Sequence, residues 1–376
     1  MATSLALAAL TSYFYQVKIA FDAKRALVNS SGLGNYSRNL LTGLRTFFPE
    51  VSLELWSSVH AREPYQSFAN SFDVHYPNSG WKLASGLWRS MMMAVDSDAD
   101  IFHGLSNEIP VFSSNKAKRV VTIHDLIFLK HRQQYPFFDR KIYEAKTQWA
   151  CQHADMIIAT SEETKNDLIS FYGLPESKIK VIYQSCDSMF FGEAPGECPM
   201  WLPDRYLLCT GSFFSRKNQL RLIRVFEQLA KEEELHLVLI GRGGNESTAV
   251  ARAAKNSSYS NRIHVRSATN HELWWCNRNA AAVIAPSLFE GFGIPVLEAL
   301  ASGAPVAASA IGCFQEIAGA AAVYFNPEDE VDMLCVIRRL LNEDKRLLKD
   351  RAIQRAAQFT PEQSATALMG VYSGLL

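Results

Sequence analysis

Two kinds of hydrophobic pattern alternate along most of this chain. Short apolar runs such as VKIAFDA (17–23) and LHLVLIG (235–241) are followed by stretches with the 3.6-residue period of an amphipathic helix. This alternation is typical of βαβ units, whose strands pair in parallel and whose helices cover the sheet. The sequence therefore predicts an α/β fold.

The alternating pattern occurs in two series, and a chain of 376 residues is expected to form two domains. Residues 190–204, FFGEAPGECPMWLPD, collect prolines and glycines without periodicity, which is typical of a linker. We predict two doubly wound, Rossmann-like parallel-sheet domains that face each other across a cleft. Their predicted bounds are a tail at 1–16, a first domain at 17–190, a linker at 191–204 and a second domain at 205–359.

Composition excludes several functional classes. Lysine plus arginine and aspartate plus glutamate both number 38, so nothing in the net charge favours binding to nucleic acid. A local excess of eight basic over three acidic residues at 116–146 is either a solvated surface or a face turned toward phosphates or anionic lipid. Seven cysteines without a CxxC pair indicate neither a zinc knuckle nor a disulfide framework, and favour a reducing cytoplasm.

The opening segment MATSLALAALTSYFYQ (1–16) is apolar but has no basic residue before its hydrophobic run. It is also much shorter than the roughly 20 residues that span a bilayer. We interpret it as a tail, with a misplaced start site or a short amphipathic membrane contact as the alternatives.

The stretch EGFGIPVLE (290–298) places two glutamates around a glycine turn that enters a helix. Pro295 suits a first helical turn, and the backbone amides of Phe292, Gly293 and Ile294 would form an anion site at the positive end of the helix dipole. Glu298 would lie one turn inside the helix, where its natural partner is a neutral hydroxyl such as that of a ribose. Glu290 would approach whatever the phosphate carries, although a structural role at the helix start is the alternative.

The segment GSFFSRKNQL, which begins at Gly211, supplies two cations after the first strand of the second domain. Arg216 and Lys217 could stabilise a departing diphosphate there, since charge stabilisation is the largest catalytic term for an anionic leaving group. The alternative is a surface pair that caps the next helix.

In the first domain, SSGLGN (30–35) is interpreted as a glycine loop, and Tyr36 begins the apolar stripe of the helix after it. Its two glycines, Gly32 and Gly34, give only G-x-G, a weak dinucleotide fingerprint, so a turn close to a ligand and a plain turn are equally acceptable. VVTIHDL places His124 at the carboxyl end of a strand, where it would either face the cleft or lie satisfied in the core.

Together, EGFGIPVLE, the preceding IAPSL and GSFFSRKN resemble the retaining glycosyltransferases of the GT-B fold, in the large group 4 family whose hallmark is E-x7-E. The resemblance runs from Val17 to the C-terminus and includes ADMIIATSEETKNDL and VIYQSCD. One departure is Ser185, which replaces the usual glycine of the Y-x-G-x-D segment.

This resemblance implies a nucleotide-diphosphate sugar donor, no other cofactor and no metal. It places Glu298 on the ribose, Arg216 and Lys217 on the diphosphate, and Glu290 with the 292–294 backbone on the transferred sugar. It further implies that Gly32 and Gly34 lie under the phosphates or the acceptor and that His124 contacts the donor sugar. The closing segment, 360–376, would form a helix that completes the first, acceptor-side domain.

TIHDLIFLKHRQQYP (122–136) is similar to segments of bacterial mannosyltransferases that build surface polysaccharide. We therefore expect transfer of mannose from GDP-mannose to a lipid-linked acceptor glycan, in the cytoplasm and in peripheral contact with the inner membrane. A UDP-sugar donor, a sugar-nucleotide epimerase or hydrolase of the same fold, and a noncatalytic nucleotide-sugar sensor are the alternatives.

Overall fold

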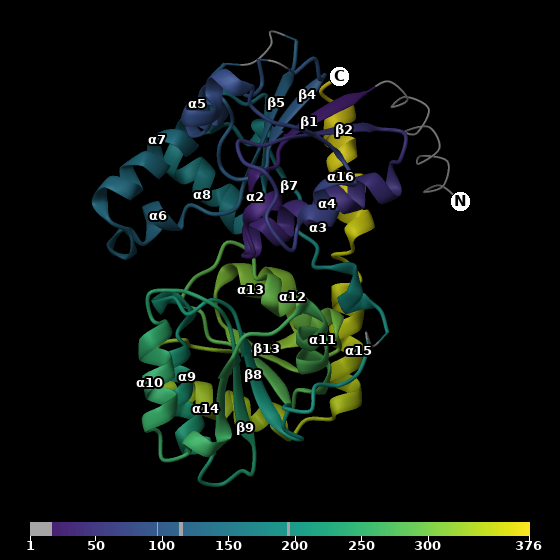
Figure 1. The fold of residues 1–376 in the computed structure, drawn as a ribbon. Helices are drawn as coiled ribbons and strands as arrows, with labels where there is room; N and C mark the ends of the chain where they lie inside the picture. Colours follow the sequence, from purple (N-terminus) through teal and green to yellow (C-terminus); the bar gives the residue numbers. More distant parts are fainter. Residues whose placement is uncertain (1–16, 96, 113–115, 194–195) are drawn as a thin grey trace. The chain divides into compact units, whose positions relative to one another are not determined.

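The computed structural model describes residues 17–95, 97–112, 116–193 and 196–376, and the predicted tail at 1–16 lies outside these ranges. Within them the chain divides into two compact units. The first unit contains the residues up to Ser185 together with Pro361–Leu376, and the second contains Cys186–Thr360. Each unit is built around one sheet with helices on both faces (Figure 1).

The first unit contains a seven-stranded sheet of order β3-β2-β1-β4-β5-β6-β7. Every neighbouring pair in it is parallel. Its strands are β1 (Lys18–Asp22), β2 (Ser52–Trp56), β3 (Asp73–His75), β4 (Ile101–Gly104), β5 (Lys118–Ile123), β6 (Met156–Ala159) and β7 (Ile179–Val181). The strand order reverses between β1 and β4, which makes this the topological switch point of the sheet.

The second unit contains a six-stranded parallel sheet of order β10-β9-β8-β11-β12-β13. Its strands are β8 (Tyr206–Thr210), β9 (His236–Ile240), β10 (Ile263–Arg266), β11 (Ala282–Ala285), β12 (Val306–Ser309) and β13 (Ala322–Phe325). Four consecutive residues of β9 are buried, the near-continuous apolar run expected of a strand covered on both faces. Here the strand order reverses between β8 and β11. The two sheets confirm the predicted fold class of two doubly wound units.

Helices connect the strands of both units. In the first unit they are α2 (Lys24–Val28), α3 (Gly32–Phe47), α4 (Gln66–Ala69), α5 (Ser85–Met91), α6 (Ile127–Lys130), α7 (Phe137–His153), α8 (Glu162–Tyr172) and α16 (Pro361–Ser373). In the second unit they are α9 (Gln219–Leu229), α10 (Ser247–Asn256), α11 (Asn270–Asn279), α12 (Ile294–Ala301), α13 (Gly312–Ala318), α14 (Glu330–Leu341) and α15 (Lys345–Ala356). Short 3-10 turns include η4 (Ser188–Phe191) and η5 (Ser215–Lys217).

One local prediction was wrong. The segment SSGLGN does not form a glycine loop, because helix α3 already begins at Gly32 and its N-cap is Ser31. Gly34 is required for packing rather than for a turn. A Cβ atom on it would lie 1.9 Å from the carbonyl oxygen of Asn29, so only glycine lets the first turn of α3 cross the chain at this point.

The C-terminal helix α16 belongs to the first unit, where it packs along α3 (Figure 1). Leu368, Met369 and Tyr372 lie in the same core as β1 and α3, and burial of side chains of this size stabilises a fold by about 1.5–3 kcal/mol each. A buried hydrogen-bond chain also ties α16 to the sheet. The Tyr372 hydroxyl lies 2.5 Å from Nδ1 of His103, whose Nε2 lies 2.9 Å from the Thr122 hydroxyl.

Candidate active site at the carboxyl edge of the second sheet

The loops that follow β8 and β11 carry most of the predicted site residues. These two strands are neighbours in the second sheet and flank its switch point. Ligands of open parallel α/β sheets bind in the crevice at such a point, outside the carboxyl ends of the strands. The topology therefore brings Arg216 and Lys217, from the β8 loop, to the same edge as Glu290, from the β11 loop.

The β8 loop is held in a fixed shape by its backbone. Gly211, directly after β8, has a φ of 131°, and Asn218 adopts a left-handed φ of 60° at the N-cap of α9. The Asn218 amide donates to the carbonyl oxygen of Pro286 at 3.1 Å and to that of Pro327 at 2.9 Å. Asn218 thereby ties the cation-bearing turn η5 to the end of β11.

The carboxylate of Glu290 forms ion pairs with both cations. Its Oε2 lies 2.5 Å from Nη1 of Arg216, its Oε1 lies 2.5 Å from Nζ of Lys217, and the Ser287 hydroxyl donates to Oε1 at 2.8 Å. The three charged side chains are only 10–24% exposed, so water screens them weakly. Burial by itself raises the pKa of Glu290, but Lys217 and then Arg216 outweigh it and hold the pKa at about 2. Glu290 is therefore ionised at neutral pH.

Helix α12 begins beside this cluster. Gly293 is its N-cap with a φ of 120°, Ile294 is its first residue, and Pro295 follows in the first turn. A Cβ atom on Gly293 would also lie 2.8 Å from the Phe314 ring, so both conformation and space require glycine. Phe292 is buried with its ring against Phe359. The turn consequently aims the amino end of α12, the positive end of its dipole, at the carboxyl edge of the sheet.

Glu298 lies one turn inside α12 and differs from Glu290 in its charge state. Its side chain is buried, and burial, followed by the nearby charge of Asp187, raises its pKa to about 8 although Lys217 opposes the shift. Glu298 is therefore largely protonated at pH 7 and can both donate and accept a hydrogen bond. The two glutamates of the E-x7-E motif thus have opposite protonation states.

A small cavity lies among these elements. Its lining residues are Cys209, Thr210, Lys217, Ala285, Pro286, Ser287, Glu290, Pro295 and Phe314. Lys217 and Glu290 line this cavity, and Arg216 also pairs with Glu290. With two cations, one carboxylate and the amino end of α12 nearby, the potential is net positive, which favours an anionic ligand such as a phosphate group.

Three residues of this site were not predicted from the sequence. Ser287 orients the Glu290 carboxylate, Asn218 fixes the cation turn, and Asp187 helps to keep Glu298 protonated. An asparagine directly after the RK pair was the available signal for Asn218, because asparagine tolerates the left-handed conformation. Asp187 lies far from Glu298 in the sequence, and no local pattern links them.

The remaining predicted residues belong to the first unit. His124 follows β5 and is 7% exposed, with Nε2 2.8 Å from the Leu105 carbonyl oxygen and Nδ1 3.3 Å from the Gln184 amide. A carbonyl oxygen can only accept, so Nε2 carries the proton and Nδ1 accepts from Gln184. Burial lowers the pKa of His124 to about 4, which keeps the ring neutral.

Gly32 and Gly34 both lie in the first turn of α3, and their surroundings differ. A Cβ atom on Gly32 would meet no atom within 4 Å, whereas Gly34 is enclosed by the Asn29 and Arg25 backbone. Close to this turn, the Tyr36 ring packs edge-on against the His124 ring at 4.6 Å.

The carboxyl end of β1 also carries a buried ion-pair cluster. Arg89 contacts Asp22 at 2.6 Å and also pairs with Glu108, and all three side chains are at most 17% exposed. Burial opposes the charge of Arg89, and the two carboxylates outweigh it. No local sequence pattern indicates this cluster, because its members come from three separate segments.

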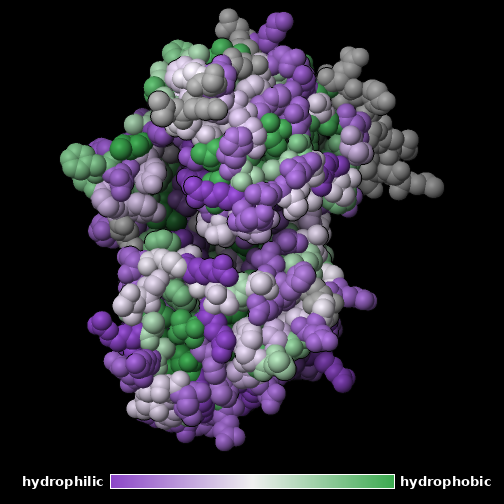
Figure 2. Space-filling view, viewed as in Figure 1, coloured by the Kyte–Doolittle hydropathy of each residue, from purple (hydrophilic) through white to green (hydrophobic). Residues whose placement is uncertain are grey.

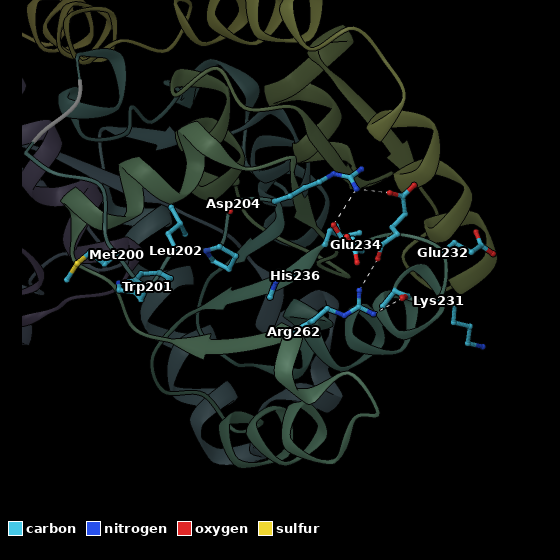
Figure 3. Close-up of a pocket in the computed structure, with 14 residues that line it drawn as sticks. Met200, Trp201, Leu202, Asp204, Lys231, Glu232, Glu234, His236 and Arg262 are labelled. Atoms are coloured by element: carbon cyan, nitrogen blue, oxygen red, sulfur yellow. Dashed lines mark hydrogen bonds and ion pairs between the residues drawn. The ribbon is translucent and has the colours of Figure 1, made fainter.

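A much larger hollow lies at the opposite edge of the second sheet. It is bordered by Trp201, His236 and Arg262 (Figure 3), and His236 is the first residue of β9. Because ligands of parallel sheets bind at the carboxyl ends of the strands, this hollow is set apart from the chemistry of Glu290. Its charges are already paired in part, as Arg205 contacts Glu233 at 2.8 Å.

Among the described residues, one group of metal-ligand type gathers in the first unit, formed by Glu54, Asp73 and His75. The ammonium group of Lys18 lies 3.2 Å from Glu54 and supplies positive charge there. None of the described helices is both long enough and apolar enough to pass through a bilayer.

Comparison with known proteins accounts for nearly the whole chain. Residues 31–188 match the family model "Glycosyltransferase Family 4", and residues 202–359 match "Glycosyl transferases group 1". The O-antigen chain mannosyltransferase B of Escherichia coli is 23% identical over 95% of this chain and 99% of its own length. The O-antigen chain mannosyltransferase RfbU of Salmonella typhimurium is 25% identical over 83% of this chain and 88% of its own.

Solved structures share the fold at low sequence identity. Anabaena HepE, in complex with UDP and glucose, aligns with a TM-score of 0.74 at 15% identity and covers 96% of this chain and 100% of its own. WaaG, a glycosyltransferase involved in lipopolysaccharide biosynthesis, aligns with a TM-score of 0.71 at 14% identity over 95% of this chain and 100% of its own. The architecture is thus that of GT-B glycosyltransferases. The chain belongs to the group 1, or family 4, glycosyltransferases, a family of retaining and metal-independent enzymes.

Proposed function

We propose that this glycosyltransferase transfers mannose from GDP-mannose to a hydroxyl of a lipid-linked glycan during surface polysaccharide synthesis. The observation that carries the proposal is the convergence of Arg216 and Lys217 on Glu290 beside the amino end of α12. The two mannosyltransferases of O-antigen chains that match most of the chain support the sugar and the kind of acceptor.

The diphosphate of the donor binds at the cation pair. Arg216 and Lys217 bond to its oxygens, and the amides of the first α12 turn, at Gly293 and Ile294, face its negative charge. Gly211 lies beside the Lys217 side chain and has a φ of 131°, a backbone conformation that favours glycine. Glu298, protonated and one turn deeper, bonds to the ribose hydroxyls.

Glu290 takes a second role once the donor is bound. The diphosphate competes with Glu290 for both cations, so the carboxylate turns to the hydroxyls of the transferred sugar, where Phe292 and the 292–294 backbone complete the contact. His124, neutral and held by Gln184 and Leu105, offers Nδ1 to a sugar hydroxyl after exchanging its Gln184 partner. Gly32 and Gly34, at the start of α3, lie under the phosphates or the acceptor.

The reaction breaks the bond between the anomeric carbon and the diphosphate oxygen and forms a new bond from that carbon to the acceptor oxygen on the same face. The acceptor proton passes to the departing phosphate oxygen, so no further reactant is needed. Charge that develops on the diphosphate is stabilised by Arg216 and Lys217, which is the catalytic term we expect to dominate. In this proposal the acceptor lies at the cytoplasmic face of the inner membrane.

The donor is tested by thermal unfolding with GDP, UDP and ADP, alone and as sugar conjugates. A ligand at about 100 times its dissociation constant adds about 2.7 kcal/mol to the folded state. We expect GDP and GDP-mannose to raise the unfolding temperature, and Arg216→Gln to abolish the rise. The matched control is Arg205→Gln, which removes another ion-paired arginine, at the opposite edge of the same sheet, and should leave the rise intact.

Transfer itself is tested with radiolabelled GDP-mannose and membrane lipid extracts. Label in the lipid-linked fraction supports the proposal, free mannose as the main product would favour a hydrolase, and binding without any product would favour a sensor. A UDP-sugar donor is the second candidate, because HepE binds UDP and glucose in the same fold. Stabilisation by UDP but not by GDP would replace GDP-mannose with that donor.

A further inference from the structure

The first half of α7 presents apolar side chains to solvent. Phe137, Phe138, Ile142 and Tyr143 are 59%, 78%, 55% and 48% exposed. Together we call them the α7 patch. In Figure 1, α6 and α7 lie at the outer margin of the first unit, and Figure 2 shows hydrophobic atoms on this projection.

The helix periodicity places Phe138 and Ile142 opposite the packed face of α7, whereas Tyr143 lies one turn before the buried Thr147 with its ring near those of Phe128 and Tyr135. Thr147, Ala150 and Cys151 are buried against the unit, whereas Phe138, Ile142 and the exposed Ala145 follow one another on the outer stripe. A solvent-facing stripe is normally polar, so packing within the unit does not account for the exposed apolar side chains of Phe138 and Ile142.

Basic residues surround the α7 patch. Four lysines or arginines and two acids lie at 130–144. The Arg140 guanidinium lies 5.3 Å from the centroid of the Phe137 ring, and Lys141 lies one helical turn from Phe138 with its ammonium group 2.9 Å from Glu144. Aromatic rings with cations beside them are the arrangement of segments that lie in the interface of an anionic membrane.

We propose that the α7 patch docks the enzyme on an anionic lipid bilayer, with Phe137, Phe138 and Ile142 in the acyl boundary and Arg140 and Lys141 at the headgroups. A protein partner fits these observations less well, because a stable protein interface takes about 20–30 residues on each side and this patch offers one helix end. The inference deepens the proposed function, since a lipid-linked acceptor lies at such a surface.

The test is co-sedimentation of the full chain with vesicles of neutral phosphatidylcholine and with vesicles that contain anionic phosphatidylglycerol. We expect binding to the anionic vesicles alone, and weaker binding as salt rises. The double variant F137S/F138S should lose at least about tenfold in affinity through lost apolar contact. R140Q/K141Q should also lose about tenfold, because each cation near an anionic surface contributes on the order of 1 kcal/mol.

Two controls separate docking from general effects. Phe171→Ser removes a phenylalanine that is 41% exposed on α8 of the same unit, and K345Q/R346Q neutralises two exposed cations on α15. Both should bind vesicles like the parent chain. Vesicle binding that F137S/F138S leaves unchanged, or no binding of the parent chain, would overturn the proposal.

A self-associating parent chain that becomes monomeric in F137S/F138S, without vesicle binding, would assign the patch to a protein contact instead. Because vesicle binding is measured without a donor, it can succeed while sugar transfer fails. The outcome for the patch is therefore distinguishable from that of the proposed function.

Discussion

The ammonium nitrogen of Lys217 lies 2.5 Å from one oxygen of Glu290, while Arg216 contacts the other oxygen at the same distance. The carboxylate therefore neutralises, without any donor, one of the two positive charges that a diphosphate would need. In the proposed function, donor binding is therefore an exchange of one anion for another. This exchange would make Glu290 both a competitor of the diphosphate and a contact of the sugar.

The Glu290→Gln variant tests this double role. An amide keeps the shape and the Ser287 contact but no longer neutralises the cations, so we expect free nucleoside diphosphate to bind about tenfold more tightly, or about 1.4 kcal/mol. Turnover should fall about 10- to 100-fold, because a hydrogen bond to a charged group contributes about 1.5–3 kcal/mol. Titration calorimetry and initial rates measure the two effects.

The control for that variant is Glu233→Gln, which frees Arg205 at the other edge of the sheet. Glu233→Gln should change neither the affinity for nucleoside diphosphate nor the turnover. Weaker nucleotide binding by Glu290→Gln would show that the carboxylate orients the cations rather than competing for them.

Glu298 gives the enzyme a pH-dependent stability with a definite sign. Its pKa is about 8 in the folded state and close to the ordinary 4.5 when unfolded. Between these values the folded chain retains a proton that the unfolded chain has released, so the free energy of unfolding falls as pH rises, by up to about 1.4 kcal/mol per pH unit. This stabilising contribution is complete below pH 4.5 and is lost as pH passes through 8.

Glu298→Gln is neutral at every pH and should remove that slope. We expect its stability relative to the parent chain to increase steadily from pH 5 to pH 8 in urea unfolding followed by tryptophan fluorescence. Parallel curves for the two proteins would mean that Glu298 is ionised in the folded state.

Local patterns predicted the fold class and strands such as β1 and β9, because buried parallel strands are continuous apolar runs. They missed β3 and β13, each of which lies at one edge of its sheet. Asp73–His75 is polar and at most half-buried, and Ala322–Phe325 follows an alanine-rich stretch that also suits a helix. Such strands are defined by their pairing partners, which local periodicity does not contain.

The same limit applies to the site. EGFGIPVLE indicated the helix start and both glutamates, because the preference of glycine for a turn and of proline for the first helical turn can be recognised locally. The protonation of Glu298 depends instead on burial and on Asp187, which folding brings near from another segment. The predicted glycine loop at 30–35 was wrong for a related reason. Gly34 is needed because it packs against the backbone of Asn29. In the sequence, a glycine needed for close packing cannot be distinguished from one needed for a turn.

Gly32 and Gly34 form a matched pair two residues apart in α3. Gly34→Ala would place Cβ 1.9 Å from the Asn29 oxygen, so we expect a loss of at least about 2 kcal/mol through strain in packed backbone. Gly32→Ala meets open space and should be neutral or stabilise by up to about 1 kcal/mol, because alanine restricts the unfolded chain.

Thermal unfolding of both variants measures the difference. If Gly32→Ala folds normally but loses sugar transfer, the added methyl group obstructs a ligand and the predicted functional role of Gly32 gains support. Equal stability of the two variants would contradict the packing explanation for Gly34.

Tyr372 provides a test of how α16 is attached to the first unit. Its hydroxyl forms a hydrogen bond with Nδ1 of His103, and burial lowers the pKa of that histidine to about 3, so the ring stays neutral and depends on a hydrogen-bond partner at Nδ1. Tyr372→Phe leaves this nitrogen buried without its partner, which should cost about 1–3 kcal/mol. Scanning calorimetry should show a lower transition temperature, whereas Tyr143→Phe, at the exposed patch, should leave it unchanged.

Because His103 is neutral when folded and takes up a proton near pH 6.5 when unfolded, the parent chain loses stability as pH falls from 6.5 toward 3. The same acid-induced loss should persist in Tyr372→Phe, since burial still keeps the ring neutral; a variant that is instead stabilised by acid would show that His103 becomes protonated once the tyrosine hydroxyl is removed.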